Sequence, residues 1–426
     1  MINAAPTSRI TFSPLAGRGS GAAISGQEPV QAPRIRWGVV VHEPGLGIDG
    51  LLAEFALTLK GRGFKVSGYV QRNNEGGAVP GCGCASKVVL FDLSGGAGNS
   101  DCTLDEAVRN LAKAMREDAD LIAVSRFSAF EKAFAGAKTV ASERVSRGTP
   151  FLTSIAGRCA SRSEKWIGQS AAMLHPNIEA LWRWWGPERL YRDLALGVAS
   201  DEVRQIVCGP RWIMVEGPCG AGLAYLPRSP QQLLPRLPHL RRQSLRALAA
   251  LTQSWDPLEM ALGIAAINAH YNRSGLAARA GNGATLFRQL DGRLVAIGGF
   301  PGLSGILPDC IVIEAEPRPG EFPLVAMDTL LPGCGAAIIN SSALINRSLP
   351  RILRLGQDAR TALIGPSTPL TPRLHSYGIE VLGGLIVENV PGLARAVQAG
   401  ALPREFGKFG RFVHICDTKK HKMFDE

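Results

Sequence analysis

The sequence predicts an α/β protein whose last third forms a parallel, doubly wound sheet. Short apolar runs recur there, at residues 294–297, 310–313, 336–339, 361–364 and 380–384. An apolar run of four or five residues without alternation is typical of a strand covered on both faces. Helical stretches separate these runs, at residues 323–331, 344–355 and 391–399. This alternation indicates parallel strands joined by right-handed crossovers.

Length and composition set the wider limits. A chain of 426 residues is too long for one hydrophobic core, which predicts two or three domains. No apolar run approaches the roughly 20 residues that span a bilayer, and no signal peptide is recognisable, so we expect no membrane insertion. Nine cysteines, scattered and odd in number, argue against a disulfide framework. They favour a reducing, cytoplasmic location.

The predicted organisation has five parts, and the two ends are polar tails of the disordered type. The parts are a tail at 1–34, an α/β domain at 35–197, a small α+β domain at 200–291, a Rossmann-like domain at 292–415 and a tail at 416–426.

The net charge of +11 is unevenly spread, because five arginines and no acid lie between residues 228 and 246. Such a patch could attract nucleic acid or an anionic ligand. No aromatic residues alternate with the arginines and no nucleic-acid motif accompanies them. A solvated loop leading into a helix is therefore favoured, and we expect no nucleic-acid partner. The residues are Arg228, Arg236, Arg241, Arg242 and Arg246.

The first domain opens with a strand, a glycine-rich loop and an amphipathic helix, at 37–41, 42–50 and 51–60. This is the layout of a phosphate-binding loop. The lysine and the hydroxyl residue of such loops are missing, which removes the phosphate cation and one Mg²⁺ ligand. We therefore expect a degenerate P-loop-like domain rather than a nucleotide hydrolase. The two alignments of the glycines place Leu51 and Leu52, or Ile48 and Asp49, at these positions.

The cysteines of the first domain suggest a second hypothesis. Cys82 and Cys84, with Cys102 and His42, could form a soft-metal site. Ordinary reduced thiols are the favoured interpretation of this weak pattern. The remaining single cysteines, expected to pack as small apolar groups, include Cys208, Cys219, Cys310 and Cys334.

The small domain is predicted to begin with an antiparallel meander, at 203–208, 212–215 and 221–225, and to continue with helices at 243–253 and 257–271. Asp256 and Pro257 are strong start signals for the second helix. Asn268 and Asn272 lie on one face of it, within an apolar sequence. A buried asparagine must find partners, so each either braces a loop or meets a ligand. Bracing is favoured for Asn272, and both roles stay open for Asn268.

The turn after the strand at 361–364 is the strongest candidate for a site. Open α/β sheets bind ligands at the carboxyl ends of their strands, and three prolines restrict this turn. Polar residues that follow other strands of the sheet should lie at the same edge. The candidate ligand-binding residues are Asn268, Glu314, Glu316, Asn340, Ser341, Asn346, Gly365, Ser367 and Thr368. Ser342 belongs to the same edge.

The candidate residues are hard oxygen donors, which suit a metal ion or a carboxylate-rich chelator. Glu314 and Glu316 are the candidate metal ligands. Their spacing from Gly298 is similar to that of the ribose-binding acid in dinucleotide folds. However, the glycine fingerprint is incomplete and Pro301 lacks an N–H that could hold a pyrophosphate. A ligand smaller than NAD is therefore favoured.

The first domain resembles an uncharacterised bacterial domain that accompanies molybdenum-transport genes. The resemblance covers most of residues 35–185, although Ser125, Ser128 and Ala129 depart from the expected asparagine, glycine and lysine. It implies only a context of molybdenum transport. The matching positions are Gly68-Tyr69-Val70-Gln71, Cys102-Thr103-Leu104-Asp105, Arg126-Phe127 with Glu131, and Trp184-Trp185.

The following half of the chain, residues 203–414, resembles the "heavy-metal chelation" family of bacterial and archaeal proteins. The resemblance implies a piece similar to the N-terminal domain of enolases, followed by a Rossmann-like domain, with a site between them. It also implies a link to metal uptake or handling. The matching positions include Gly209-Pro210-Arg211-Trp212, Gly220-Ala221-Gly222-Leu223-Ala224, Gly299-Phe300-Pro301, Glu314-Ala315-Glu316-Pro317 and Gly365-Pro366-Ser367-Thr368-Pro369-Leu370.

Three hypotheses for the function follow. The first is a cytoplasmic protein that binds or handles a metal or metal chelate, linked to molybdenum, between the small and Rossmann-like domains. The second is an enzyme that uses a Rossmann-bound nucleotide cofactor, such as S-adenosylmethionine or NAD, to make or modify a small chelator. The third is a regulatory or scaffold protein of metal transport. The sequence leaves open whether a reaction is catalysed and whether the chain forms a homo-oligomer.

Overall fold

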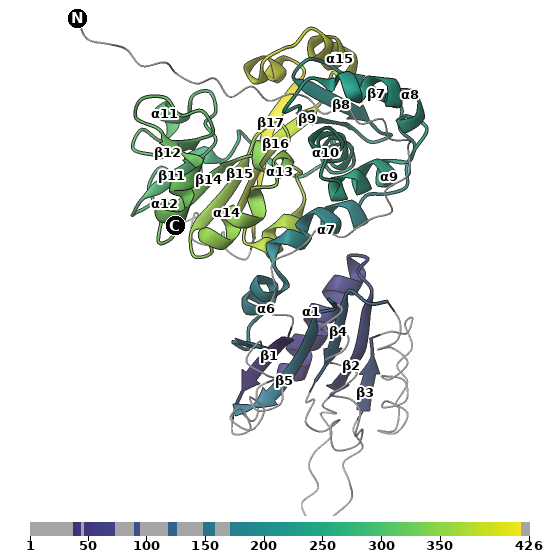
Figure 1. Cartoon of the computed structure of the whole chain (residues 1–426), viewed down its shortest axis with the longest axis vertical. Helices are drawn as coiled ribbons and strands as arrows, with labels where there is room; N and C mark the ends of the chain where they lie inside the picture. The colour runs from purple at the N-terminus through teal and green to yellow at the C-terminus, as the bar shows by residue number, and fades with distance from the viewer. Residues whose placement is uncertain are drawn as a thin grey trace, which may run out of the picture. The chain divides into compact units, whose positions relative to one another are not determined.

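A computed structural model describes residues 37–43, 47–72, 89–93, 118–125, 148–157 and 171–418, without the side chains of 71–72 and 89–92. The predicted α/β class is confirmed, because helices alternate with strands that form three sheets (Figure 1). The predicted tail at 1–34 lies outside the described residues, as do all but the first three residues of the tail predicted at 416–426. Cys82, Cys84, Cys102, Arg126 and Glu131 also lie outside them.

The first sheet has six strands in the order β3-β2-β4-β5-β1-β6. All neighbours are parallel except β2 and β3. The predicted first strand is followed by α1 (Ile48–Gly61), which begins three residues earlier than expected. Phe55 of α1 packs edge-on against Trp182 of α6 (Ile178–Trp185), with ring centroids 5.3 Å apart. The strands are β1 (Trp37–His42), β2 (Val66–Arg72), β3 (Val89–Asp92), β4 (Leu121–Val124), β5 (Phe151–Ala156) and β6 (Ala171–Leu174).

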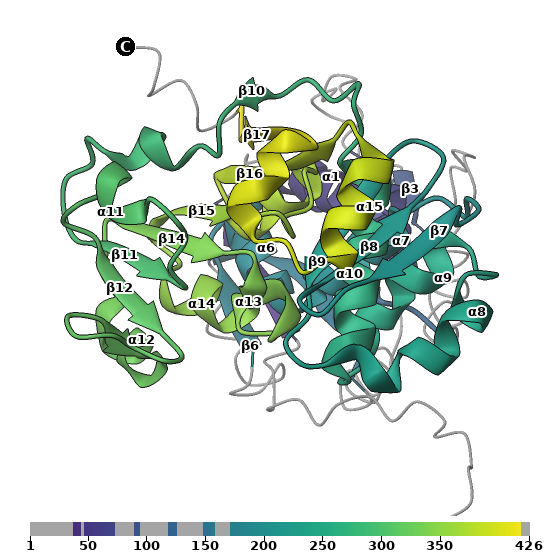
Figure 2. The same cartoon turned by 90° about the horizontal axis from the view of Figure 1, so that it is seen from above.

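The second sheet is the predicted antiparallel meander. It consists of β7 (Gln205–Cys208), β8 (Trp212–Glu216) and β9 (Ala221–Tyr225). Helix α10 (Pro257–Tyr271) packs against it, as both views show (Figures 1 and 2). Asp256 caps this helix as predicted, because its Oδ1 accepts from the backbone N–H groups of Leu258 at 2.7 Å and Glu259 at 3.2 Å.

The third sheet has eight strands in the order β10-β17-β16-β15-β14-β11-β12-β13. Counted along the chain from β11, the parallel strands have the order 3-2-1-4-5-6, which is that of the doubly wound dinucleotide-binding fold. The strands are β10 (Arg279–Ala280), β11 (Leu294–Ile297), β12 (Ile311–Glu314), β13 (Phe322–Pro323), β14 (Ala336–Asn340), β15 (Arg360–Ile364), β16 (Val381–Val387) and β17 (Gly410–Cys416).

The five strands predicted for this sheet are parallel to one another, as expected. Two strands that were not predicted add an antiparallel edge, because β17 is antiparallel to β16 and β10 is antiparallel to β17. The connection through α15 (Val390–Gln398) returns to the end of the sheet that β16 leaves, so that Gly410 pairs with Val387. A strand that enters beside its predecessor's exit must run in the opposite direction. β10 also joins this sheet from within the segment expected to form the small domain.

Helices cover both faces of the third sheet. One face packs against α12 (Met327–Leu330), α13 (Ser342–Ile345) and α14 (Leu349–Leu355), and the other against α11 (Leu303–Ile306) and the turn Ala284–Phe287. The single helix predicted at 344–355 is split into α13 and α14. Arg347 separates α13 from α14 with a φ of 60°. No described helix is both long enough and apolar enough to cross a membrane.

Candidate functional site

The strand order of the third sheet reverses between β11 and β14, which is where folds of this class bind ligands. Gly298 and Gly299 follow β11, and Asn340 ends β14. Asn340 Nδ2 donates to the backbone oxygen of Gly299 at 3.0 Å, and its Oδ1 accepts from the N–H of Ser342 at 3.0 Å. The side chain of Asn340 thus joins the two strand ends at the switch point.

Glu314, at the end of β12, lies on the other side of the glycine turn. Its Oε1 accepts from the N–H of Gly299 at 2.5 Å, and its Oε2 accepts from the N–H of Ala315 at 3.3 Å. Glu314 is half-buried, whereas Glu316 is exposed. The carboxylate of Glu314 therefore holds the N–H of Gly299 in the turn after β11, and Asn340 holds the backbone oxygen of the same residue.

Ser341 and Gly365 bring the ends of β14 and β15 together. Gly365 has a φ of 143°, and a Cβ atom at this position would lie 2.2 Å from Ser341 Oγ. The N–H of Ser341 donates to the backbone oxygen of Ile364 at 2.8 Å. Only glycine fits this conformation and this space, so the strand end and the turn after it are held in one arrangement.

The 365–371 loop attaches the third sheet to the small segment (residues 200–291). Ser367 is buried, and its Oγ accepts from the N–H of Tyr225 at 3.1 Å. Asn272 has the bracing role expected of it. Its Nδ2 donates to the oxygens of Thr368 at 2.9 Å and Leu385 at 3.3 Å, and its Oδ1 accepts from the N–H of Leu370 at 2.8 Å.

Two buried oxygen atoms in this region lack a hydrogen-bond partner among the described residues. They are Asn268 Oδ1 and Thr368 Oγ1, and both residues have no exposed surface. Asn268 Nδ2 donates to the oxygen of Leu223 at 2.8 Å, so one half of that amide braces β9. Buried polar atoms are normally satisfied by protein, water or a ligand. Because neither residue is exposed, these two oxygens mark buried positions where an ordered water would be the usual partner.

The structure thus links Glu314, Gly299, Asn340, Ser341 and Gly365 through direct contacts. Sequence reasoning missed only Gly299 within this set. Asn346 is exposed, and its Oδ1 accepts from Ser348 N at 3.0 Å and Ser348 Oγ at 2.6 Å, which closes the turn between α13 and α14.

The described residues contain no cluster of three or more His, Cys, Asp or Glu side chains that could hold a metal ion. Burial raises the pKa of Cys208 and that of Cys310 to about 11, so both thiols stay protonated at neutral pH. Thiolate is the metal-binding form of cysteine. Cys334 packs in the core as expected, but Cys219 is exposed, contrary to expectation. The described oxygen donors therefore offer a hard rather than a soft ligand set.

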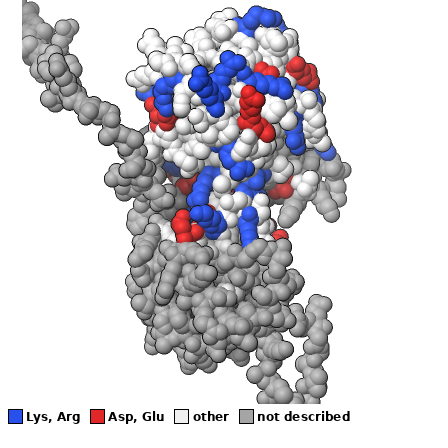
Figure 3. Space-filling view, turned by 90° about the vertical axis from the view of Figure 1, so that its right-hand side faces the viewer, with Lys and Arg blue, Asp and Glu red and all other residues white. Residues whose placement is uncertain are grey.

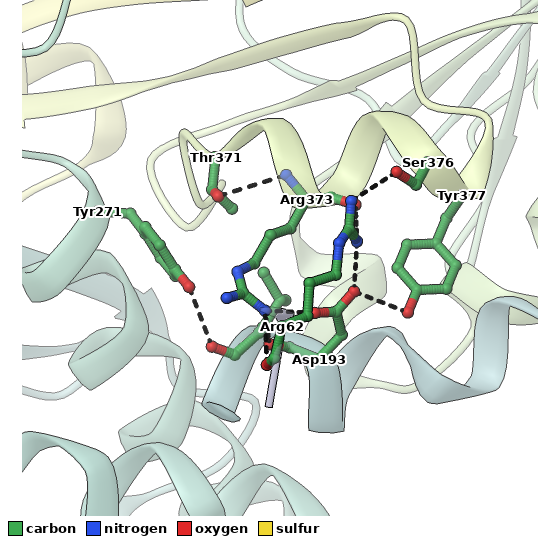
Figure 4. A network of polar contacts seen from close by, with 8 residues as sticks. Arg62, Asp193, Tyr271, Thr371, Arg373, Ser376 and Tyr377 are labelled. Atoms are coloured by element: carbon green, nitrogen blue, oxygen red, sulfur yellow. Dashed lines mark hydrogen bonds and ion pairs between the residues drawn. The ribbon is translucent and has the colours of Figure 1, made fainter. Parts of the chain in front are cut away.

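Sequence reasoning also missed a buried carboxylate that joins distant parts of the chain (Figure 4). Asp193 of α7 (Leu190–Leu196) has no exposed surface. It accepts from Arg62 Nη1 and Arg373 Nη1 at 2.6 Å each, and from the Tyr377 hydroxyl at 2.9 Å. Arg62 Nη2 also donates to Ser376 Oγ at 2.7 Å. We call these five residues the Asp193 cluster. The only signal in the sequence was an acid among the mainly apolar residues of this helix.

A second missed residue is Arg347, which adopts the left-handed conformation. Its Nη2 donates to the backbone oxygens of Thr252 at 2.5 Å and Ser254 at 2.6 Å. Its guanidinium lies over the rings of Tyr191 and Trp255, at 5.1 and 4.7 Å from their centroids. Arg347 therefore fixes the end of α13, the helix that begins directly after Ser341.

Four of the five arginines between 228 and 246 bond to other parts of the protein. Arg228 pairs with Asp256 at 2.8 Å and Arg236 with Glu259 at 2.6 Å. Arg241 and Arg246 donate to backbone oxygens. The face that carries α8 (Leu237–Leu240) and α9 (Leu245–Ala249) shows acidic residues among the basic ones (Figure 3). These bonds agree with a structural rather than a ligand-binding use of the arginines.

The fold and the site geometry define an α/β protein whose doubly wound sheet is braced by a small α+β segment, and three parts of the chain match known family models. Residues 284–416 match the DUF364 family and residues 191–271 the DUF4213 family, both described as "Putative heavy-metal chelation". Residues 38–184 match DUF2478, a family of unknown function.

One curated relative is "Molybdenum import ATP-binding protein ModC 2" of Bradyrhizobium diazoefficiens, 30% identical over 169 residues. The match covers 35% of this chain and 18% of that protein, so the chain spans less than one fifth of its relative. Two solved structures are titled as proteins with unknown function from the DUF364 family. The structure from Desulfitobacterium hafniense DCB-2 is 28% identical in sequence. The match covers 54% of this chain and 97% of that chain, with a TM-score of 0.49. That from Pyrococcus horikoshii is 21% identical, covering 54% and 98%, with a TM-score of 0.45.

Proposed function

We propose that the protein binds and handles a metal or a metal chelate at the carboxyl edge of its third sheet. The observation that carries the proposal is the chain of contacts from Glu314 through Gly299 to Asn340, at the point where the strand order reverses. Both segments around this edge match families described as heavy-metal chelation. The linked strand ends gather oxygen donors where folds of this class bind their ligands.

The donor set defines the ligand chemistry that we propose. Carboxylate, amide and hydroxyl oxygens suit hard metal ions, and they suit a chelator held through its own polar groups. Glu314 and Glu316 would meet the metal. Asn340, Ser341 and the turn at Gly365 would hold the chelator. Four further residues would complete or support the site, namely Asn268, Asn346, Ser367 and Thr368.

We further propose that the metal is molybdenum and that the protein acts in the cytoplasm. The name of the curated relative supports a connection with molybdenum import. We infer that the ligand is a chelate of that metal and that the protein acts beside the transport machinery. Nucleic acid is not among the proposed partners, since the arginines of the 228–246 stretch bond within the protein.

Metal analysis of the purified protein, followed by thermal-shift measurements with molybdate, tungstate and divalent cations, tests the proposal. A ligand at a hundredfold excess over its Kd stabilises the folded state by about 2.7 kcal/mol, which raises Tm by several degrees. Glu314→Gln should reduce this shift. Glu388→Gln, a surface carboxylate paired with Arg411, is the matched control and should leave it unchanged. Equal shifts in both variants would exclude Glu314 from the site, and no shift with any metal or oxyanion would reject the function.

A second candidate is an enzyme with a nucleotide cofactor, such as S-adenosylmethionine or NAD. It is favoured by the 3-2-1-4-5-6 strand order and by the acid at the end of β12 beside a glycine turn. The same thermal-shift screen separates the two, because stabilisation by a nucleotide cofactor without any response to metal would favour the enzyme.

A further inference from the structure

A cavity of about 590 Å³ lies near the amino ends of the parallel strands of the third sheet, opposite the carboxyl ends where the metal site is proposed. Thr361, near the start of β15, lines this cavity, whereas Gly365 follows the end of the same strand. The cavity is bounded by α6, the end of α14, the turn Pro372–Tyr377 and the end of β17. Its volume falls within the range of about 300–1,000 Å³ that small-molecule sites occupy.

The walls of the cavity are mainly apolar, with an aromatic side that is held rigidly. Trp182 is only 8% exposed, and its ring meets the ring of Tyr377 edge-on at 5.5 Å. The guanidinium of Arg62 lies 4.6 Å from the centroid of Trp182. Arg62 and Tyr377 both belong to the Asp193 cluster, which fixes this wall in place. The apolar lining includes Ile178, Trp182, Leu276, Ala277, Leu353 and Ile415.

Charged groups of both signs line the same cavity, namely Arg183, Arg354, Glu179 and Asp417. The two arginines pair with acids outside the lining, Arg183 with Asp358 and Arg354 with Glu188. More than half of each arginine side chain is exposed. The Arg183–Asp358 pair is exposed at both residues and such pairs are weak, so the guanidinium of Arg183 can turn to a bound anion at small cost. Arg354 keeps its mostly buried partner Glu188, and its guanidinium has further N–H groups that can donate to a ligand.

Ser376 supplies a directed donor in this cavity. Its Oγ already accepts a hydrogen bond from Arg62 Nη2 at 2.7 Å. A hydroxyl that accepts in this way still has its own proton to donate. A carboxylate placed beside Ser376 would therefore receive this O–H group together with an arginine.

We propose that this cavity is a second ligand site, which takes a small zwitterion with an apolar body, such as an aromatic amino acid. The carboxylate of the ligand binds Ser376 and a guanidinium of Arg354 or Arg183. Its ammonium group faces Glu179 or Asp417. Its ring lies against Trp182. A purely apolar ligand would make no use of the charged groups that line the cavity, and a simple anion would meet two acids.

Calorimetric titration of the full-length protein with L-phenylalanine tests the proposal. The matched probes are 3-phenylpropionate, which lacks the ammonium group, and 2-phenylethylamine, which lacks the carboxylate. We expect phenylalanine to bind at least tenfold more tightly than either analogue. Equal binding of the three compounds, or no binding of phenylalanine at millimolar concentration, would overturn the proposal.

Two variants locate the binding. Ala277→Phe fills the cavity from its lining, whereas Ala247→Phe adds the same ring to an exposed position of α9 outside it. We expect Ala277→Phe to lower the affinity for phenylalanine at least tenfold and Ala247→Phe to leave it unchanged, with unchanged thermal unfolding of both. Equal affinity in the two variants would show that the cavity is not the site. Glu314→Gln should bind phenylalanine normally, which separates this site from the proposed metal site.

Discussion

Asp193 Oδ1 lies 2.6 Å from Arg373 Nη1, and the carboxylate that makes this ion pair has no exposed surface. Arg62 approaches the other carboxylate oxygen to 2.6 Å. Arg62, Asp193 and Arg373 belong respectively to the segments that match DUF2478, DUF4213 and DUF364. One carboxylate thus connects all three matched parts of the chain.

Asp193→Asn should therefore destabilise the protein strongly. Removing one partner from a buried ion pair costs about 3–5 kcal/mol, because the remaining charges stay buried. Urea unfolding followed by circular dichroism measures the loss. Asp358→Asn breaks the exposed pair with Arg183 and should cost less than about 1 kcal/mol. Similar midpoints for the two variants would show that the Asp193 cluster contributes little.

Gly365→Ala should destabilise the protein by roughly 1–3 kcal/mol through its backbone conformation alone. The new Cβ would also lie 2.2 Å from Ser341 Oγ. Adding Ser341→Ala removes that oxygen and should recover part of the loss in Tm. The strained φ of 143° remains, so full recovery in the double variant would contradict this account.

Asn272→Ala should loosen the 365–371 loop. The substitution removes three hydrogen bonds and leaves buried backbone groups of Thr368, Leu370 and Leu385 unpaired. Each such group costs about 1–3 kcal/mol. Hydrogen exchange should accelerate at the N–H of Leu370 and in its neighbours. Asn346→Ala, at an exposed turn, is the control. Unchanged protection of Leu370 would refute the bracing role.

Alkylation should distinguish the buried thiols from the exposed one. Burial raises the pKa of Cys310 and Cys208 to about 11, so little thiolate forms at pH 8. Cys219 is exposed and should react at least about tenfold faster than either, even though a thiolate of higher pKa is the better nucleophile. Peptide mapping after timed iodoacetamide labelling gives the rates. Labelling of Cys310 should rise steadily as the pH approaches 11, and a rate independent of pH would contradict the assignment.

Five strands of the third sheet were predictable because a strand buried on both faces has a short, continuous apolar sequence. The two-residue strands β10 and β13 are too short to leave such a pattern. The antiparallel edge was not predictable, since Arg411 and His414 interrupt the apolar residues of β17 and its direction depends on the return of the chain after α15. The break at Arg347 was hidden because arginine gives no indication of a left-handed conformation. The Asp193 cluster joins residues 131 to 314 positions apart along the chain, a separation that no local pattern reports.

Part of the candidate site was predictable for a similar reason. The rule that polar residues gather at the carboxyl ends of strands correctly brought Glu314, Asn340 and Ser341 together. Local sequence could not show that Ser367 accepts a hydrogen bond from Tyr225, because that partner lies in another sheet. A hydroxyl in a turn predicts a polar contact but not the identity of its partner.

The side-chain amide of Asn272 forms a joint between α10 and the 365–371 loop, and this joint affects how such proteins can diversify. The amide recognises only main-chain atoms, at positions 368, 370 and 385. Mutations that replace the side chains of the loop therefore leave the joint intact, whereas most changes at Asn272 would break it. New ligand preferences can accumulate in the loop without the two parts coming apart.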